Sequence, residues 1–109
     1  MLARTPDPPY VAVIFTSLRT DEDHAGYGAM ADEMERLGAA QPGFLGIESV
    51  RGADGFGITV AYWRSAADAR AWKGHVDHLA AQKLGRERWY RAYRVCIAEV
   101  AREYGFARE

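Results

Sequence analysis

The stretch YWRSAADARAWKGHVDHLAAQKLGRERWYRAY, residues 62–93, organises the chain. It contains all three tryptophans and two of the three histidines. No other stretch concentrates side chains that can stack on a ligand or exchange protons near neutral pH. It begins at the end of a predicted strand, residues 57–63, and ends where a long last strand over residues 89–102 begins.

Between these two strands the sequence predicts a broken helix. Ser65 can cap a short helix over residues 66–73, because its hydroxyl can accept from a free backbone N–H of the first turn. Gly74 allows this helix to stop. A second helical piece is predicted over residues 78–84, and Gly85 closes it.

The first 40 residues predict a tail, a strand and a helix. Residues 1–9 form a flexible tail, because three prolines there disfavour regular structure. Residues 10–18 are rich in β-branched and aromatic side chains and predict a strand. Thr20 and Asp23 match a capping box, so they predict a helix that opens at Thr20 and ends near residues 38–40.

The predicted order is strand, helix, strand, strand, broken helix, strand. Residues 44–51 and 57–63 form a hairpin around a turn whose glycines supply positive φ. This order predicts an α+β fold, the ferredoxin-like sandwich, with a four-stranded antiparallel sheet and helices on one face. A single domain is predicted over residues 10–109.

Both faces of the predicted sheet are apolar, although two helical segments can cover only one of them. An exposed face should alternate to polar residues. We therefore expect a second sheet on the uncovered face, which predicts a homodimer joined through its sheet faces; the alternative is a monomer with an apolar exposed sheet. Each strand contributes residues to both faces: Val13 and Ile14, Leu45 and Phe44, Val60 and Ala61, Val95 and Cys96.

Composition excludes several classes of function. The net charge of -1 and the pI of about 6.3 argue against nucleic acid or an anionic membrane as the main partner. No apolar run approaches the roughly 20 residues of a membrane span, and residues 1–9 lack the apolar core of a signal peptide. The single cysteine, Cys96, is expected to be a buried small hydrophobe in a cytoplasmic protein.

Three side chains on the broken helix are candidates for chemistry. Trp72 could form a stacking wall for an aromatic ligand; the alternative is core packing on the sheet. His75 or His78 could act as a general base, because histidine titrates near neutrality; the alternative is a surface or capping role. A metal site would need a third ligand, and His24 belongs to another helix, so no metal is predicted.

Two further groups of side chains could stabilise charge on a ligand. Tyrosines could donate a proton to a developing oxyanion, unless they are ordinary strand residues with the hydroxyl at the sheet edge: Tyr62, Tyr90 and Tyr93. A basic run could hold an anionic group, unless it pairs with nearby glutamates: Arg86, Arg88, Arg91 and Arg94.

The chain carries, in this order, Trp63-Arg64-Ser65, Ala66 to Ala69, Trp72, His78, Ala81, Gly85 and Trp89-Tyr90. In these residues and in its order of elements it resembles the antibiotic biosynthesis monooxygenase family, whose members are dimeric α+β barrels. The resemblance covers residues 10–106. It implies that an electron-rich phenol or quinol binds between sheet and helices and reacts with O₂ without flavin or metal.

Carried over residue by residue, the resemblance matches only in part. Trp72 matches the tryptophan that follows the third strand in the quinol and haem branches. Both branches also use an asparagine, and this chain has none; Thr16, His75 or Arg94 would have to substitute for it. The haem branch implies a histidine about three helical turns beyond its tryptophan, and Gln82 stands near that place.

The leading hypothesis is a cofactor-independent monooxygenase that oxidises a small aromatic or polycyclic quinol or phenol. Trp72 would stack on the ring, and His75 or His78 would take the phenolic proton. The first alternative is a non-catalytic ligand-binding or structural dimer of the same fold. The second is a haem-binding or haem-degrading oxygenase. The further substrate-binding candidates are Tyr62, Thr16 and Arg94.

Overall fold

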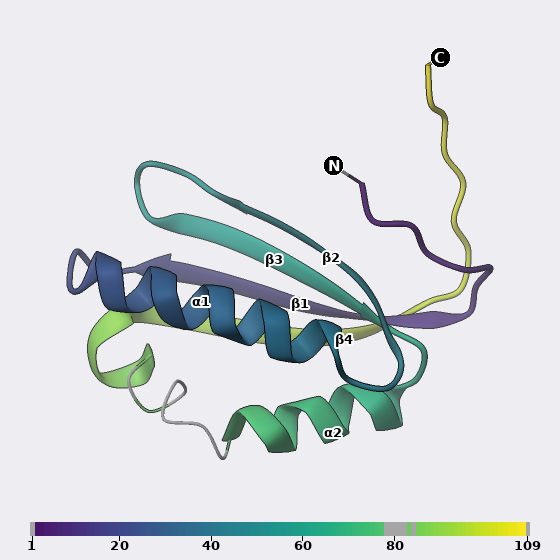
Figure 1. Ribbon diagram of the computed structural model, residues 1–109. Coiled ribbons are helices and arrows are strands. Elements are labelled where there is room, and N and C mark those ends of the chain that lie inside the picture. Colours follow the sequence, from purple (N-terminus) through teal and green to yellow (C-terminus); the bar gives the residue numbers. More distant parts are fainter. Residues whose placement is uncertain (1, 78–82, 84, 109) are drawn as a thin grey trace.

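A four-stranded antiparallel sheet carries the fold, and two helices pack on one of its faces (Figure 1). The computed structural model describes residues 2–77, 83 and 85–108. The strands lie in the order β2-β3-β1-β4. The elements of the described residues are β1 (Tyr10–Arg19), α1 (His24–Ala39), β2 (Phe44–Arg51), β3 (Phe56–Trp63), α2 (Ala66–Asp77), a single π-type turn (Gly85–Trp89) and β4 (Tyr90–Val100).

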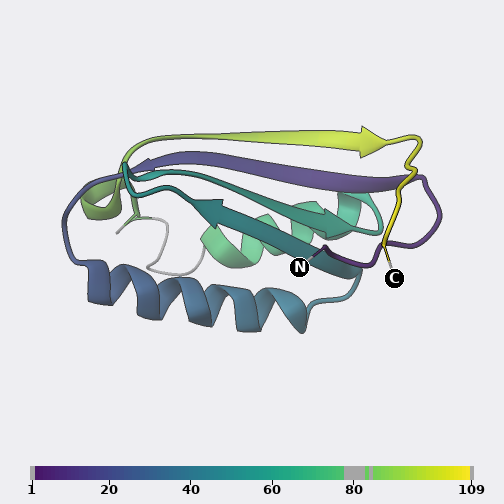
Figure 2. The ribbon, with the colours of Figure 1, turned by 90° about the horizontal axis from the view of Figure 1, so that it is seen from above.

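The ferredoxin-like prediction is confirmed by the pairing of the strands. β1 lies in the centre and pairs antiparallel with both β3 and β4. Val13, for example, lies opposite Ala61 on one side and Ile97 on the other. Figure 2 shows β4 at the edge of the sheet farthest from α1, which lies beside β2 at the other edge.

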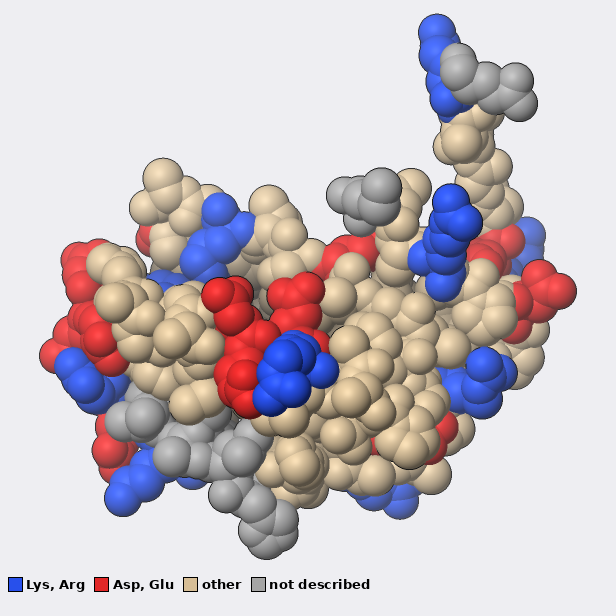
Figure 3. Space-filling view, in the orientation of Figure 1, with Lys and Arg blue, Asp and Glu red and all other residues tan. Residues whose placement is uncertain are grey.

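The core lies between the sheet and α2. Trp63 is 1% exposed and packs with Val11 and Ala69. Trp72 of α2 joins this cluster and also contacts Gly38 of α1, where an added Cβ would lie 3.3 Å from Cζ2 of Trp72. The outer side of α1 carries charged side chains (Figure 3), among them the ion pair between Glu33 and Arg36.

The predicted capping box at the start of α1 is wrong. The helix begins at His24, and Asp23 is its N-cap, with a left-handed φ of 53°. Asp23 Oδ1 accepts from the backbone N–H of Gly26 over 3.1 Å. Thr20 Oγ1 instead donates to the carbonyl of Arg88. The helix starts late because Thr20 is used to join β1 to the turn before β4.

The predicted break at Gly74 is also wrong, because α2 runs through it to Asp77. A helical glycine costs only about 1 kcal/mol relative to alanine. Packing of Trp72, on the same helix as Gly74, against Trp63 of β3 offsets this cost. The second predicted piece, residues 78–84, lies outside the described residues apart from Lys83. The last strand starts one residue later than predicted, at Tyr90, because Trp89 belongs to the π-type turn.

The sheet face opposite the helices, here called the outer face, is apolar and largely uncovered. Val50, Phe56 and Ile58 are 71%, 49% and 37% exposed there. Cys96 lies on the same face of the edge strand β4 and is exposed, so the prediction that it is buried is wrong for the single chain. No helix of the described residues is long and apolar enough to cross a membrane.

Candidate functional site

Trp72 and His75 lie together at one end of the helix-facing side of the sheet. The two rings stack with centroids 5.4 Å apart and an interplanar angle of 19°. Trp72 is half-buried and also stacks on Trp63, at 6.2 Å between centroids, whereas His75 is exposed. The indole therefore contributes to the core, while the imidazole remains accessible to solvent. His78, the other predicted base, lies outside the described residues.

Thr16, Arg94 and Tyr62 lie on the outer face instead. Thr16 is directly opposite Arg94 in the register of β1 and β4. Tyr62 donates its hydroxyl to Glu48 over 2.6 Å, and this hydrogen bond is the main cause that raises the pKa of Tyr62 to about 12. The predicted site residues thus form two groups on opposite faces of the sheet, and they do not line one pocket in a single chain.

A polar cluster that the sequence analysis missed lies at the far end of the helix-facing side. It surrounds a cavity of about 210 Å³ between the end of β1, the first turn of α1 and the β2–β3 hairpin. Arg19 is only 6% exposed there, and Arg51 is half-buried. The cavity is lined by Arg19, Thr20, His24, Tyr27 and Arg51 and by acidic and hairpin residues on its rim.

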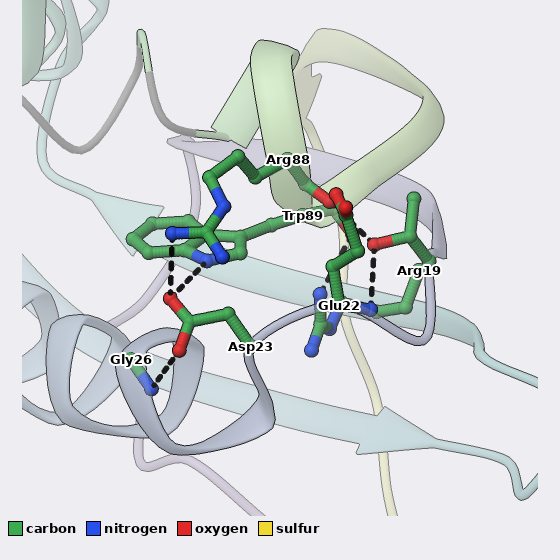
Figure 4. A network of polar contacts seen from close by, with 7 residues as sticks. Arg19, Glu22, Asp23, Gly26, Arg88 and Trp89 are labelled. Carbon is green, nitrogen blue, oxygen red and sulfur yellow. Dashed lines mark hydrogen bonds and ion pairs between the residues drawn. The ribbon is translucent and has the colours of Figure 1, made fainter.

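Arg19 bridges three elements. Its Nη1 donates to the carbonyl of Trp89 over 2.7 Å (Figure 4), and its Nη2 contacts Nδ1 of His24 at 3.1 Å. Since arginine has no acceptor, Nδ1 accepts in this contact, and the neutral imidazole carries its proton on Nε2. The guanidinium carbon lies 3.9 Å from the centroid of the Tyr27 ring, a cation–π contact.

Arg51 approaches the same ring from β2. Its Nη2 donates to Ser17 Oγ over 2.7 Å and to the Tyr27 hydroxyl over 3.3 Å, and its Nη1 donates to the carbonyl of Gly55. Its guanidinium carbon is 5.7 Å from the Tyr27 centroid. Gly55 adopts a φ of 89°, which favours glycine, and this turn brings its carbonyl to both the Arg51 side chain and the backbone N–H of Arg19.

A row of aromatic side chains leads from this cluster along the helix-facing side. Tyr27 contacts Tyr90, Tyr90 contacts Phe15, and Phe15 contacts Tyr93, with centroids 5.4–5.8 Å apart. A bulge between Leu18 and Arg19 sets the register that turns Tyr90 to this side. Burial, followed by the hydrogen bond to the Tyr27 hydroxyl, raises the pKa of Tyr90. Tyr90 therefore stays protonated. Its one O–H donates to the Tyr27 hydroxyl over 3.5 Å and would turn away from Tyr27 to donate to a ligand.

The helix-facing side of β4 is open to solvent beyond this row. Val95 lies opposite Phe15, and Ile97 lies opposite Val13. Their side chains are 46% and 60% exposed, because the helices contact mainly β1, β2 and β3. The aromatic row and β4 together form an apolar surface on which a flat ring can lie. Among the described residues, no group of three acidic, histidine or cysteine side chains gathers closely enough to hold a metal ion.

The sequence analysis identified some residues of this site and missed others. Tyr90 and Tyr93 were candidate proton donors, and the structure places both on the helix-facing side. The sequence analysis did not identify Arg19 and Arg51, because a charged residue at the end of a strand does not by itself indicate a binding site. Only the register of the hairpin against β1 brings them to one cavity.

Solved structures share this fold at low sequence identity. SnoaB of Streptomyces nogalater, a cofactor-independent oxygenase, superposes with a TM-score of 0.73 and 16% identity over 89% of this chain and 97% of that one. Rv0793 of Mycobacterium tuberculosis superposes with a TM-score of 0.74 and 20% identity over 88% of this chain and 99% of that one. These likenesses define the class of fold.

The sequence comparisons define the family. The family model for antibiotic biosynthesis monooxygenase matches residues 9–84, and the chain therefore belongs to that family. The uncharacterized protein YqjZ of Bacillus subtilis is 52% identical over 102 residues, which cover 94% of this chain and 89% of that protein.

Proposed function

We propose that the protein is a cofactor-independent monooxygenase that oxidises a small aromatic or polycyclic quinol or phenol with O₂. The observation that carries this proposal is the aromatic row on the helix-facing side, which joins an open apolar surface to buried hydrogen-bond donors. Membership of the family and the likeness to the SnoaB oxygenase support it.

The substrate itself supplies the electrons in such a reaction. Removal of the phenolic proton makes the ring a reductant for O₂, and the protein orients the ring and stabilises the oxyanion. With an anthrone, the ring methylene loses two hydrogen atoms and gains one oxygen atom as a carbonyl. The second oxygen atom leaves with those two hydrogens as water, so that no external reductant is consumed.

Roles for individual residues follow from their places in the fold. Tyr90 is the donor to the oxyanion, because it is protonated and half-buried beside Phe15 and Tyr27. His75 is the candidate base, since its ring is exposed on the helix-facing side, and Trp72 holds it by stacking. Both residues lie on the helix-facing side of the sheet, where the family resemblance implies that the substrate binds.

The functional form in this proposal is a homodimer joined through the outer faces. Val50, Phe56 and Ile58 expose an apolar surface there that a second sheet would bury. Thr16 and Arg94, which lie on this face, then belong to the interface and not to the substrate site. A sedimentation mass near 12.1 kDa, that of one chain, would contradict the dimer.

Oxygen consumption tests the oxygenase directly. The purified chain, treated with a chelator, is supplied with a panel of hydroquinones and anthrones, and the rate is compared with that of buffer alone. We expect at least one electron-rich phenol to raise the rate. If no compound does so, the oxygenase proposal fails and the non-catalytic alternative is favoured.

A further inference from the structure

Two positively charged side chains line the cavity between the β2–β3 hairpin and the first turn of α1, and neither forms an ion pair within the described residues. Within the described residues, no carboxylate lies within 4 Å of the guanidinium of Arg19 or Arg51. Their acceptors are uncharged: carbonyls, hydroxyls and the imidazole nitrogen of His24. A buried charge without a counterion is costly, and it makes the cavity attractive to an anion.

The nearby carboxylates do not fill this role. Asp21 and Asp54 lie on the rim of the cavity and are exposed, and Asp54 accepts from the backbone N–H of Phe56. Asp23 accepts hydrogen bonds from Gly26 and Trp89 and forms an ion pair with Arg88. Asp23 interacts with Arg19 only through space, as the last of the causes that lower the pKa of Asp23. Both guanidiniums line the cavity without a carboxylate of the described residues in contact with them.

Free donors remain to hold a ligand. A guanidinium has five N–H groups. Arg19 uses two of them within the described structure, and Arg51 uses three. On Arg51 the Nε–H and one N–H of Nη1 remain, each as a single donor, and on Arg19 the Nε–H and one N–H of each Nη remain. These groups can donate to the oxygens of an anion.

We propose that Arg19 and Arg51 form a binding site for the carboxylate of a small planar aromatic acid. Both guanidiniums lie near the ring of Tyr27, with their carbons 3.9 Å and 5.7 Å from its centroid. Tyr90 and Phe15 extend the aromatic surface away from Tyr27. The cavity, at about 210 Å³, is smaller than the roughly 300–1,000 Å³ of pockets that enclose a drug-sized ligand. It fits one acidic group and an adjoining ring, while the rest of the ligand extends along the aromatic row.

The site requires no turnover and stands independently of the oxygenase. If the proposed function holds, the site selects substrates that carry an acidic group on the ring over neutral ones of the same shape.

Binding of 1-naphthoate to the full chain tests the site by calorimetry, with 1-naphthamide as the neutral analogue of the same shape. We expect naphthoate to bind at least tenfold more tightly than naphthamide. The Arg51→Gln variant should lose at least tenfold in naphthoate affinity, and Arg70→Gln, which removes an exposed charge on α2, should match the wild type. Because these are binding measurements, failure of the oxygenase appears separately in the oxygen assay.

Three results would overturn the site. Equal affinity of the wild type for naphthoate and naphthamide would overturn the site, and this comparison needs no arginine variant. Unchanged binding to a folded Arg51→Gln variant would place the anion elsewhere. Inorganic phosphate that binds more tightly than naphthoate would show a general anion site and not one for an aromatic acid.

Discussion

Trp89 donates its indole N–H to Oδ2 of Asp23 over 3.3 Å and so joins the turn before β4 to the N-cap of α1 (Figure 4). The same carboxylate caps α1 through Gly26 and pairs with Arg88 at 3.6 Å. These two segments are 66 residues apart in the chain. One aspartate therefore joins the two elements that frame the arginine cluster.

The charge of Asp23 should stabilise the fold in a pH-dependent way. The hydrogen bond from Trp89, followed by that from Gly26, lowers the pKa of Asp23. A lowered folded-state pKa stabilises the protein above the ordinary value of about 3.9, and this contribution is lost as the pH falls through the folded-state value. We expect Asp23→Asn, which keeps an acceptor for Gly26, to lower Tm at pH 7 and the difference to shrink below about pH 4.

Thermal melts between pH 3 and 7 measure this difference. The matched control is Asp21→Asn, whose side chain is exposed and makes no hydrogen bond or ion pair within the described residues. A constant difference between Asp23→Asn and the wild type across this range would mean that the charge does not contribute.

Two glycines of α1 should respond differently to the same substitution. Gly28 has no atom within 4 Å of an added Cβ, so Gly28→Ala should raise the free energy of unfolding by about 0.5–1 kcal/mol. At Gly38 the added Cβ would lie 3.3 Å from the indole of Trp72. Gly38→Ala should therefore gain less than Gly28→Ala or destabilise the protein. Urea denaturation of both variants measures the two changes, and equal gains would contradict the tight contact.

A charge on the outer face should dissociate the proposed dimer. Ile58→Lys places an ammonium in the exposed apolar surface, where burial against a second sheet would cost several kcal/mol. We expect the sedimentation mass to fall from about 24 kDa, twice 12.1 kDa, to that of one chain. The control Ala67→Lys, on the exposed side of α2, should keep the larger mass. A dimeric Ile58→Lys variant would place the interface on another surface.

Loss of the Tyr90 hydroxyl should slow oxygenation. Removal of one donor to an oxyanion lowers kcat by roughly 10²-fold, so Tyr90→Phe should do so with whichever quinol the panel identifies. Tyr104→Phe serves as the control, because Tyr104 is 94% exposed in the C-terminal segment. Equal rates for wild type and Tyr90→Phe would remove Tyr90 from the mechanism without touching the family assignment.

Haemin should not bind as it does in the haem branch of the family. The position at which the resemblance implies a histidine ligand carries Gln82, and a glutamine side chain is a poor ligand for haem iron. We expect titration with haemin to give no Soret shift beyond that of haemin in buffer. A saturable shift would favour the haem-binding alternative over the quinol oxygenase.

Local patterns in the sequence were enough for the order of the elements. The β-branched run of β1, the glycine turn before β3 and the cap at Ser65 each depend on neighbours within a few residues, so they predict the order of elements in the ferredoxin-like fold. Apolar residues on both faces of every strand likewise predicted the uncovered outer face. That face is observed, although it leaves Cys96 exposed in the single chain.

Tertiary structure decided what local patterns could not. Asp23 rather than Thr20 caps α1, because Thr20 and Asp23 find partners in the turn before β4. The bulge after Leu18 turns Tyr90 toward the helices, and the hairpin brings Arg51 to the ring of Tyr27. These outcomes depend on register between segments far apart in the chain. The sequence by itself determined which elements form, while packing between distant segments determined which side chains meet in the cavity.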